Sequence, residues 1–301
     1  HNPRSSMSET QIHTIEADGV EVFYREAGKA NASVVILLHG FPSSSFQYRN
    51  LITKLSGRYR VVAPDLPGFG FTKVPESRKY QYTFDNIAKT IEAFVDALSL
   101  KKYAIYIFDY DAPTGLSIHH TCNYGLALSR PDAITAIISQ NGNAFEAGFG
   151  DFWDSIRKYW KDPSPANRAS LRWLTQFDAT KFQYEAGEAH PENIPPETYH
   201  LDQALMDRPG NADIQLDLQL DYQNNIALYP SFHDYFRQYQ PPLLAIWGRN
   251  DSFFIPAGAE AFKTVLPKAK VRFVEGGHFA LENHLEEIAS EMIGFFEDNG
   301  I

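Results

Sequence analysis

Three polar side chains stand where short apolar runs of this chain end, and together they could perform nucleophilic catalysis. Asp109 follows the run YAIYIF, Asp251 follows LLAIW within WGRND, and His278 follows VRFV within EGGHF. In an α/β enzyme, a side chain at such a strand end stands above the edge of the sheet. The order nucleophile, acid and histidine is that of a catalytic triad in which aspartate replaces serine. The sequence therefore predicts an enzyme.

An aspartate nucleophile needs no base to become reactive, because an ordinary aspartate has a pKa of about 3.9 and is ionised at neutral pH. It can displace a leaving group from saturated carbon and become an alkyl ester. We expect His278, oriented by Asp251, to deprotonate a water that attacks the ester carbonyl of Asp109. The backbone N–H groups of Tyr110 and Phe41 are expected to form the oxyanion hole.

Each of these residues also has an ordinary structural interpretation. Taken singly, Asp109 would be a turn or helix-cap aspartate, Asp251 a helix cap, and His278 a loop histidine. The arrangement of all three after three separate buried strands favours catalysis.

The chain is acidic: it has 301 residues, a formal net charge of -10 and one cysteine, Cys122. The acidic balance argues against nucleic acid or an anionic membrane as a partner. A single cysteine excludes an internal disulfide and fits a reducing cytoplasm. The apolar runs are much shorter than the roughly twenty residues that span a bilayer. We expect a cytoplasmic monomer or homodimer that acts on a small apolar substrate with water and needs no metal or other cofactor.

Alternating strand and helix patterns predict an α/β fold with a doubly wound, mostly parallel sheet. The residues before Met7 are typical of an expression-tag remnant. A hairpin is expected around Asp18 and Gly19. Six apolar runs then suit strands that are covered on both faces, and helical periodicities separate them. These runs are SVVILL, RVVAP, YAIYIF, AITAIIS, PLLAIW and KVRFV.

Between residues 144 and 240 the alternation stops, and aromatic residues recur at helical spacing. Six prolines predict several short helices joined by turns: Pro163, Pro165, Pro195, Pro196, Pro209 and Pro230. We predict that 144–240 forms a helical cap inserted between two parts of the core, 7–143 and 241–301.

Five motifs carry the candidate residues: HGFPSSS at 39–45, DLPGFG at 65–70, DYDAPTG at 109–115, WGRND at 247–251 and GGHF at 276–279. With these motifs the chain resembles the α/β-hydrolase family, in its branch of epoxide hydrolases and haloalkane dehalogenases. The resemblance covers nearly the whole catalytic domain. It implies a mostly apolar pocket between core and cap.

The cap resembles that branch more loosely, through LDYQNN around Tyr222. Epoxide hydrolases carry there a tyrosine that hydrogen-bonds the epoxide oxygen, which makes Tyr222 the first candidate donor and Tyr184 the second. Both could instead belong to the core of the cap. Trp153, like Trp160 and Trp173, either lines the pocket or packs the cap.

The leaving group separates the two activities of this branch. Haloalkane dehalogenases usually hold the halide with a tryptophan after the nucleophile and often an asparagine in the HG loop, where this chain has Tyr110 and Phe41. Phenylalanine offers no donor. Fluoroacetate dehalogenases typically have an arginine after the nucleophile, which Tyr110 does not supply. We therefore predict epoxide hydrolysis first, with dehalogenation of a haloalkane or haloacid as the alternative.

Two departures from the family pattern motivate a hypothesis of another class. Asp111 stands where the turn normally has glycine, and SIHHTCNYG at 117–125 is an insertion. A side chain at 111 would crowd the turn, and its charge would repel that of the nucleophile. The alternative is a catalytically impaired small-molecule-binding protein.

Two other interpretations of this region have little support. His119 and Cys122 could share a helix face but would still lack a further metal ligand. Ester hydrolysis by serine has little support, since Ser117 lies too far along the helix.

Overall fold

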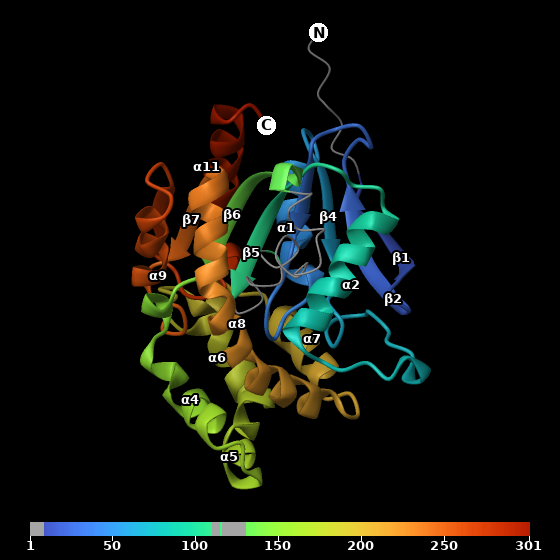
Figure 1. Ribbon diagram of the computed structural model, residues 1–301, viewed down its shortest axis with the longest axis vertical. Coiled ribbons are helices and arrows are strands. Elements are labelled where there is room, and N and C mark those ends of the chain that lie inside the picture. Colours follow the sequence, from blue (N-terminus) through green and yellow to red (C-terminus); the bar gives the residue numbers. More distant parts are fainter. Residues whose placement is uncertain (1–8, 110–114, 116–130) are drawn as a thin grey trace.

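An eight-stranded sheet forms the centre of the protein, as a computed structural model that describes residues 9–109, 115 and 131–301 shows (Figure 1). The strand order is β1-β2-β4-β3-β5-β6-β7-β8. The predicted hairpin is confirmed, because β1 (Gln11–Ala17) and β2 (Val20–Ala27) pair antiparallel around Asp18 and Gly19. Strand β2 also pairs antiparallel with β4, and all later pairs are parallel.

The six predicted apolar runs all form strands, namely β3 (Val34–Leu37), β4 (Arg60–Pro64), β5 (Tyr103–Asp109), β6 (Ile134–Gly142), β7 (Leu243–Gly248) and β8 (Lys270–Val274). Every residue of β5 and β7 is buried. Strands covered on both faces need no polar alternation, which explains the continuous apolar runs in the sequence.

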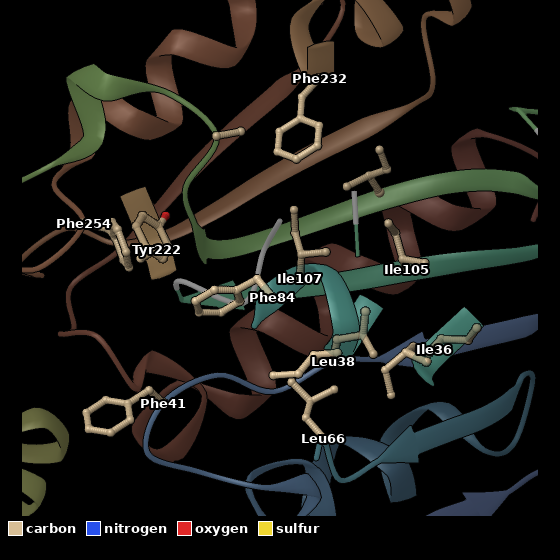
Figure 2. Close-up of a cluster of buried hydrophobic side chains, with 14 of the residues drawn as sticks. Ile36, Leu38, Phe41, Leu66, Phe84, Ile105, Ile107, Tyr222, Phe232 and Phe254 are labelled. Carbon is tan, nitrogen blue, oxygen red and sulfur yellow. The ribbon is translucent and has the colours of Figure 1, made fainter. Parts of the chain in front are cut away.

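Successive residues of β5 point to opposite faces of the sheet and build two separate cores. Ile105 and Ile107 pack in the core that includes residues of α2 (Phe84–Ala97), as Figure 2 shows with Phe84 nearby. Tyr106 and Phe108 pack in the core formed with α1 (Arg49–Leu55) and α11 (Leu285–Asp298). Helices on both faces make the sheet doubly wound. The short helices α9 (Pro256–Ala261) and α10 (Ala280–Asn283) complete the C-terminal part.

Between β6 and β7 the chain runs through five α-helices, whose shorter members gather at one end of the molecule (Figure 1). They are α4 (Asp154–Lys161), α5 (Pro165–Ser170), α6 (Phe177–Glu185), α7 (Pro196–Met206) and α8 (Asn211–Tyr239). The predicted cap boundaries at 144 and 240 lie in the two connections to the core. Pro165 and Pro196 begin helices, where a missing N–H has no cost.

The expectation that Pro230 ends a helix is wrong. Helix α8 is 29 residues long and runs through Pro230 without ending there. Pro230 is exposed, so the carbonyl that loses its helical partner can bond to solvent. Tyr229 and Phe232 on either side are buried in the core and hold the helix in place. Tertiary packing here outweighs the local preference of proline. Within the described part of the chain, no helix is long and apolar enough to cross a bilayer.

Candidate active site

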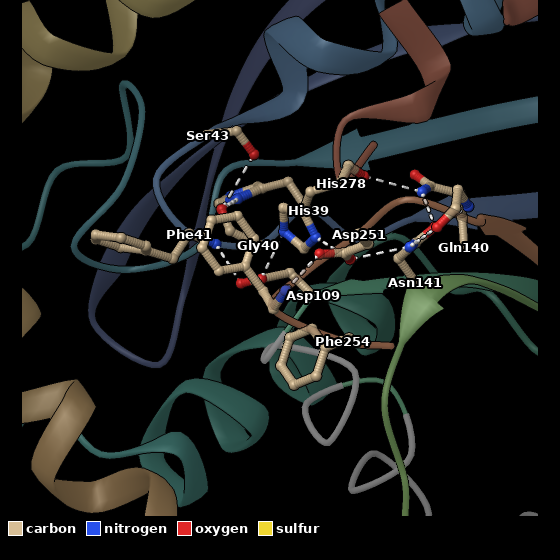
Figure 3. Close-up of polar contacts among 12 residues, drawn as sticks. His39, Gly40, Phe41, Ser43, Asp109, Gln140, Asn141, Asp251, Phe254 and His278 are labelled. Atoms are coloured by element: carbon tan, nitrogen blue, oxygen red, sulfur yellow. Dashed lines mark hydrogen bonds and ion pairs between the residues drawn. The ribbon is translucent and has the colours of Figure 1, made fainter. Parts of the chain in front are cut away.

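Asp109 is the last residue of β5 and has a backbone φ of 57°, in the left-handed region that residues other than glycine seldom adopt. Its side chain is buried against the loop after β3: a Cβ on Gly40 would lie 2.4 Å from the Cβ of Asp109. The backbone N–H of Phe41 donates to Oδ2 of Asp109 at 3.0 Å (Figure 3). The left-handed backbone at this strand end therefore presents the carboxylate to a backbone donor, as is typical of strained residues at functional sites.

His278 bridges the two aspartates (Figure 3). Its Nδ1 lies 2.6 Å from Oδ2 of Asp251, and its Nε2 lies 2.8 Å from Oδ1 of Asp109. The contact with Asp109 is an ion pair only, since Nε2 has no hydrogen-bond partner in the described part of the chain. The structure thus brings together the three residues that the sequence singled out. Nε2 remains able to bond to a water beside Asp109.

Asp251 receives two further hydrogen bonds, from the Nδ2 group of Asn141 at 2.9 Å and from the backbone N–H of Phe253 at 2.7 Å. Asn141, near the end of β6, has a φ of 49°, which asparagine tolerates better than most residues. Sequence reasoning missed it, although NGN follows the apolar run AITAIISQ at the same edge of the sheet. Asn141 fixes the orientation of the carboxylate that orients His278.

The electrostatics of the site favour a protonated His278. Burial alone lowers the pKa of this histidine, but the charge of Asp251 and the contacts with Asp109 raise it from 6.5 to about 10. A change that removes the charge of Asp109 lowers the pKa of His278, because it takes away one of the causes that raise it. An ester on Asp109 would therefore help His278 to lose its proton and become a base.

His39 holds the loop that carries Gly40 and Phe41. Its Nε2 accepts the backbone N–H of Leu66 at 3.0 Å, so its Nδ1 carries the proton and donates to the carbonyl of Gly40 at 3.0 Å. Burial lowers the pKa of His39 and keeps the ring neutral. The histidine of the HGFP motif thus holds in place the loop whose Phe41 N–H contacts Asp109.

A small cavity lies above Asp109, between core and cap. Its volume is about 20 Å³, which is room for about one water molecule and far below the roughly 300–1,000 Å³ of typical ligand sites. The described residues that line it are mostly apolar: Phe41, Asp109, Phe152, Trp153, Leu174, Gln183, Gln219 and Phe253. Trp153 lines the cavity, and its Nε1–H donates to the carbonyl of Phe253 at 3.0 Å. Its lining, mostly apolar with a few polar groups, is of the kind that binds small ligands.

The two cap tyrosines singled out from the sequence lie apart from the described lining of this cavity. The hydroxyl of Tyr222 is 2.7 Å from that of Tyr229, and its ring lies 5.0 Å from that of Trp153. The hydroxyl of Tyr184 bonds to Asp202, while its ring stacks on Phe279. Each of these tyrosine hydroxyls is thus paired with a side chain within the protein.

Several sequence predictions fall outside the described residues. They concern Tyr110 as the second oxyanion donor, Asp111 in the turn, and the insertion at 117–125 with its histidines and Cys122. Within residues 9–109, 115 and 131–301, no group of three histidine, cysteine or acidic side chains is placed to hold a metal ion.

A cap segment at 186–188 contacts the loops that carry Asp251 and His278. The side chain of Asn250, next to Asp251, donates to the carbonyl of Gly187 at 3.1 Å. The buried carboxylate of Glu188 accepts the backbone N–H of Gly277, next to His278, at 2.9 Å and lies 3.0 Å from Nε2 of His284. The hydrogen bond to Glu188 raises the pKa of His284. The cap is therefore directly connected to the loops that carry Asp251 and His278.

Comparisons with known proteins agree with this architecture. A family model described as alpha/beta hydrolase fold matches residues 33–162 and 193–285. The uncharacterized hydrolase YNR064C of Saccharomyces cerevisiae is 45% identical over 294 residues, 96% of this chain and 98% of that protein. A haloalkane dehalogenase of Psychrobacter cryohalolentis is 25% identical over 293 residues, 94% of this chain and 90% of that protein.

A solved structure also superposes on nearly the whole chain. A mutant of the haloalkane dehalogenase DatA from Agrobacterium tumefaciens C58 has a TM-score of 0.78 and 19% identity, covering 98% of this chain and 100% of that one. The protein belongs to the α/β-hydrolase fold family, and the fold class predicted from the sequence is confirmed. It is a hydrolase related to haloalkane dehalogenases.

Proposed function

We propose that this hydrolase acts through an alkyl ester of Asp109 and that its substrate is a small epoxide. The observation that carries the proposal is the placement of one carboxylate between two partners. Oδ2 of Asp109 faces the N–H of Phe41, and Oδ1 lies 2.8 Å from Nε2 of His278. This geometry supports a carboxylate that attacks carbon and is later released by a histidine-activated water.

In the first step, Oδ1 of Asp109 attacks a ring carbon, the carbon–oxygen bond of the epoxide breaks, and the ring oxygen leaves as an alkoxide. In the second, His278 takes a proton from water, and the hydroxide adds to the ester carbonyl. The negative charge develops on Oδ2, where the N–H of Phe41 donates. Collapse breaks the bond to the alkyl oxygen, which receives the proton from His278. The proton left on the Asp109 carboxyl is released and balances the proton that the alkoxide of the first step takes from water. The product is a diol.

Label transfer tests the covalent step. Repeated turnover of a small epoxide in ¹⁸O water should place ¹⁸O in the side chain of Asp109, detected by mass spectrometry of its peptide, because each hydrolysis delivers a water oxygen to its carbonyl. Turnover without label in Asp109 would exclude it as the nucleophile. Binding without turnover across epoxides, halides and esters would instead support a small-molecule-binding protein.

Dehalogenation is the second candidate, and two observations favour it. Relatives of the chain are named haloalkane dehalogenases. The hydroxyls of Tyr222 and Tyr184 are already paired with Tyr229 and Asp202, and a departing halide needs no proton donor. The same ¹⁸O experiment with a small bromoalkane, followed by release of bromide, distinguishes this activity from epoxide opening.

A further inference from the structure

We infer that the side-chain amides of Gln183 and Gln219 form the leaving-group site of this enzyme. The inference rests on the proposed function, because it assigns them to the step in which Asp109 is alkylated. The ligand they recognise is an atom that departs with a negative charge. An epoxide oxygen and a halide both belong to this class.

The two amides and the nucleophile reach the cavity from different parts of the protein. Asp109 enters from β5 of the core, whereas Gln183 comes from α6 and Gln219 from α8 of the cap. Displacement at saturated carbon requires the nucleophile and the leaving atom on opposite sides of that carbon. A substrate held between core and cap meets this requirement.

Neither amide has a hydrogen-bonding partner in the described part of the chain, although both side chains line the cavity. Gln183 is 6% exposed and Gln219 4%, and the buried Oε1 atom of Gln219 lacks a partner. Trp153 also lines the cavity, but its Nε1–H already donates to the carbonyl of Phe253. Since no hydrogen bond to the described residues fixes either amide, each can turn its Nε2 group, which is the donor, toward a ligand in the cavity.

Other buried glutamines of the cap show a different pattern. The amide of Gln203 donates to the carbonyl of Thr175 at 3.0 Å and accepts from Thr180 at 2.7 Å. The amide of Gln215, one turn before Gln219 on α8, donates to the carbonyl of Gly68 at 2.9 Å. The free amides therefore belong to the cavity and are not a general feature of cap glutamines.

An amide can donate two N–H bonds to an anion, but it gives up no proton. A halide leaves as a stable anion and needs none. An alkoxide would be held by the same N–H groups until it takes a proton from water, which leaves hydroxide in solution. The hydroxide neutralises the proton released in the second step, so the overall reaction is balanced. The site thus serves either leaving atom without a catalytic tyrosine.

Single-turnover alkylation tests this role. His278→Gln should stop the reaction at the ester, so that the mass of the Asp109 peptide reports the first step alone. In that background, Gln219→Met and Gln183→Met should each slow alkylation by 1,2-epoxybutane or 1-bromobutane on the order of 10- to 100-fold, the usual effect of removing one donor to a developing anion. The control is Gln223→Met, the same change at an exposed position of α8.

The outcomes separate the inference from the proposed function. Slowing with the epoxide alone identifies an oxygen site, and slowing with the bromide alone a halide site; either supports the inference. Ester formation at an unchanged rate in both methionine variants overturns the inference and leaves the ester mechanism intact. No ester with either reagent overturns both. If Gln219→Met does not fold, Gln219→Glu preserves the shape and should slow alkylation further, because it sets a negative charge against the anion.

Discussion

Neutralising Asp109 should change the acidity of His278, and the size of the change follows from the site. Asp109→Asn keeps the shape of the side chain but removes its charge, as an ester would. Oδ1 of Asp109 lies 2.8 Å from Nε2 of His278. An opposite charge at such close range strengthens proton binding by roughly 10- to 1,000-fold. His278 in the variant should therefore release its proton at a clearly lower pH than in the wild type, where its pKa is raised to about 10.

Histidine NMR provides the assay. The chain has 10 histidines, and the signal of His278 is identified by its loss in His278→Gln. Titration of the labelled protein then gives the midpoint of His278 in the wild type and in Asp109→Asn. Asp178→Asn, at an exposed position of the cap, is the matched control.

The same midpoint in the wild type and in Asp109→Asn would refute the reasoning, because Asp109 could then not be a source of the raised pKa. A lower midpoint has a direct catalytic meaning. The enzyme would begin its cycle with a protonated imidazole beside the nucleophile. Alkylation would make that imidazole release its proton to solvent and become the base for the next step, and the proton would return when the carboxylate of Asp109 is restored.

Further expectations concern stability and positioning. Since the folded-state pKa of His278 is raised from 6.5 to about 10, its stabilisation is complete below pH 6.5 and lost as the pH rises to about 10, so the wild-type Tm should fall across this window more than that of Asp109→Asn. Gly40→Ala puts a Cβ 2.4 Å from that of Asp109; it should cost about 1–3 kcal/mol in urea unfolding and lower kcat. Asn141→Ala removes a donor to a buried carboxylate and should cost about 1–3 kcal/mol in the same assay. Glu188→Gln should return the pKa of His284 toward its ordinary value in NMR titration, and an unchanged pKa would show that Glu188 does not raise it.

The fold was predictable because its strands are continuous apolar runs that only a doubly covered sheet can bury. The strand ends then placed Asp109, Asp251 and His278 at one edge, and their approach within hydrogen-bonding or ion-pair distance follows from the parallel pairing of β5 with β6, β6 with β7 and β7 with β8. The position of Phe41 near Asp109 was predictable as well, because the motif that contains Phe41 follows β3, and β3 pairs with β5.

The cap side chains were harder to predict, because aromatic and polar residues alternate on several faces of its helices. The sequence cannot show that the hydroxyl of Tyr222 meets Tyr229, seven residues along α8, or that Tyr184 meets Asp202 of another helix. Gln183 and Gln219 carry no motif, and their lack of partners becomes visible only in three dimensions. The prediction that Pro230 ends a helix failed for a related reason. A proline is tolerated at this position because its side of α8 faces solvent, which the sequence alone does not show.

The segment at 186–188 bears on the design of chimeras. New substrate ranges are commonly sought by grafting the lid of one relative onto the body of another. Here a transplanted lid without an acidic residue at the position of Glu188 would leave the backbone N–H of Gly277 without its carboxylate acceptor. Gly277 lies next to His278, whose position depends on this loop. Gly277 itself could not accept a larger residue, because a Cβ there would lie 2.0 Å from the carbonyl oxygen of Ala186. A functional hybrid would have to inherit both sides of this junction together.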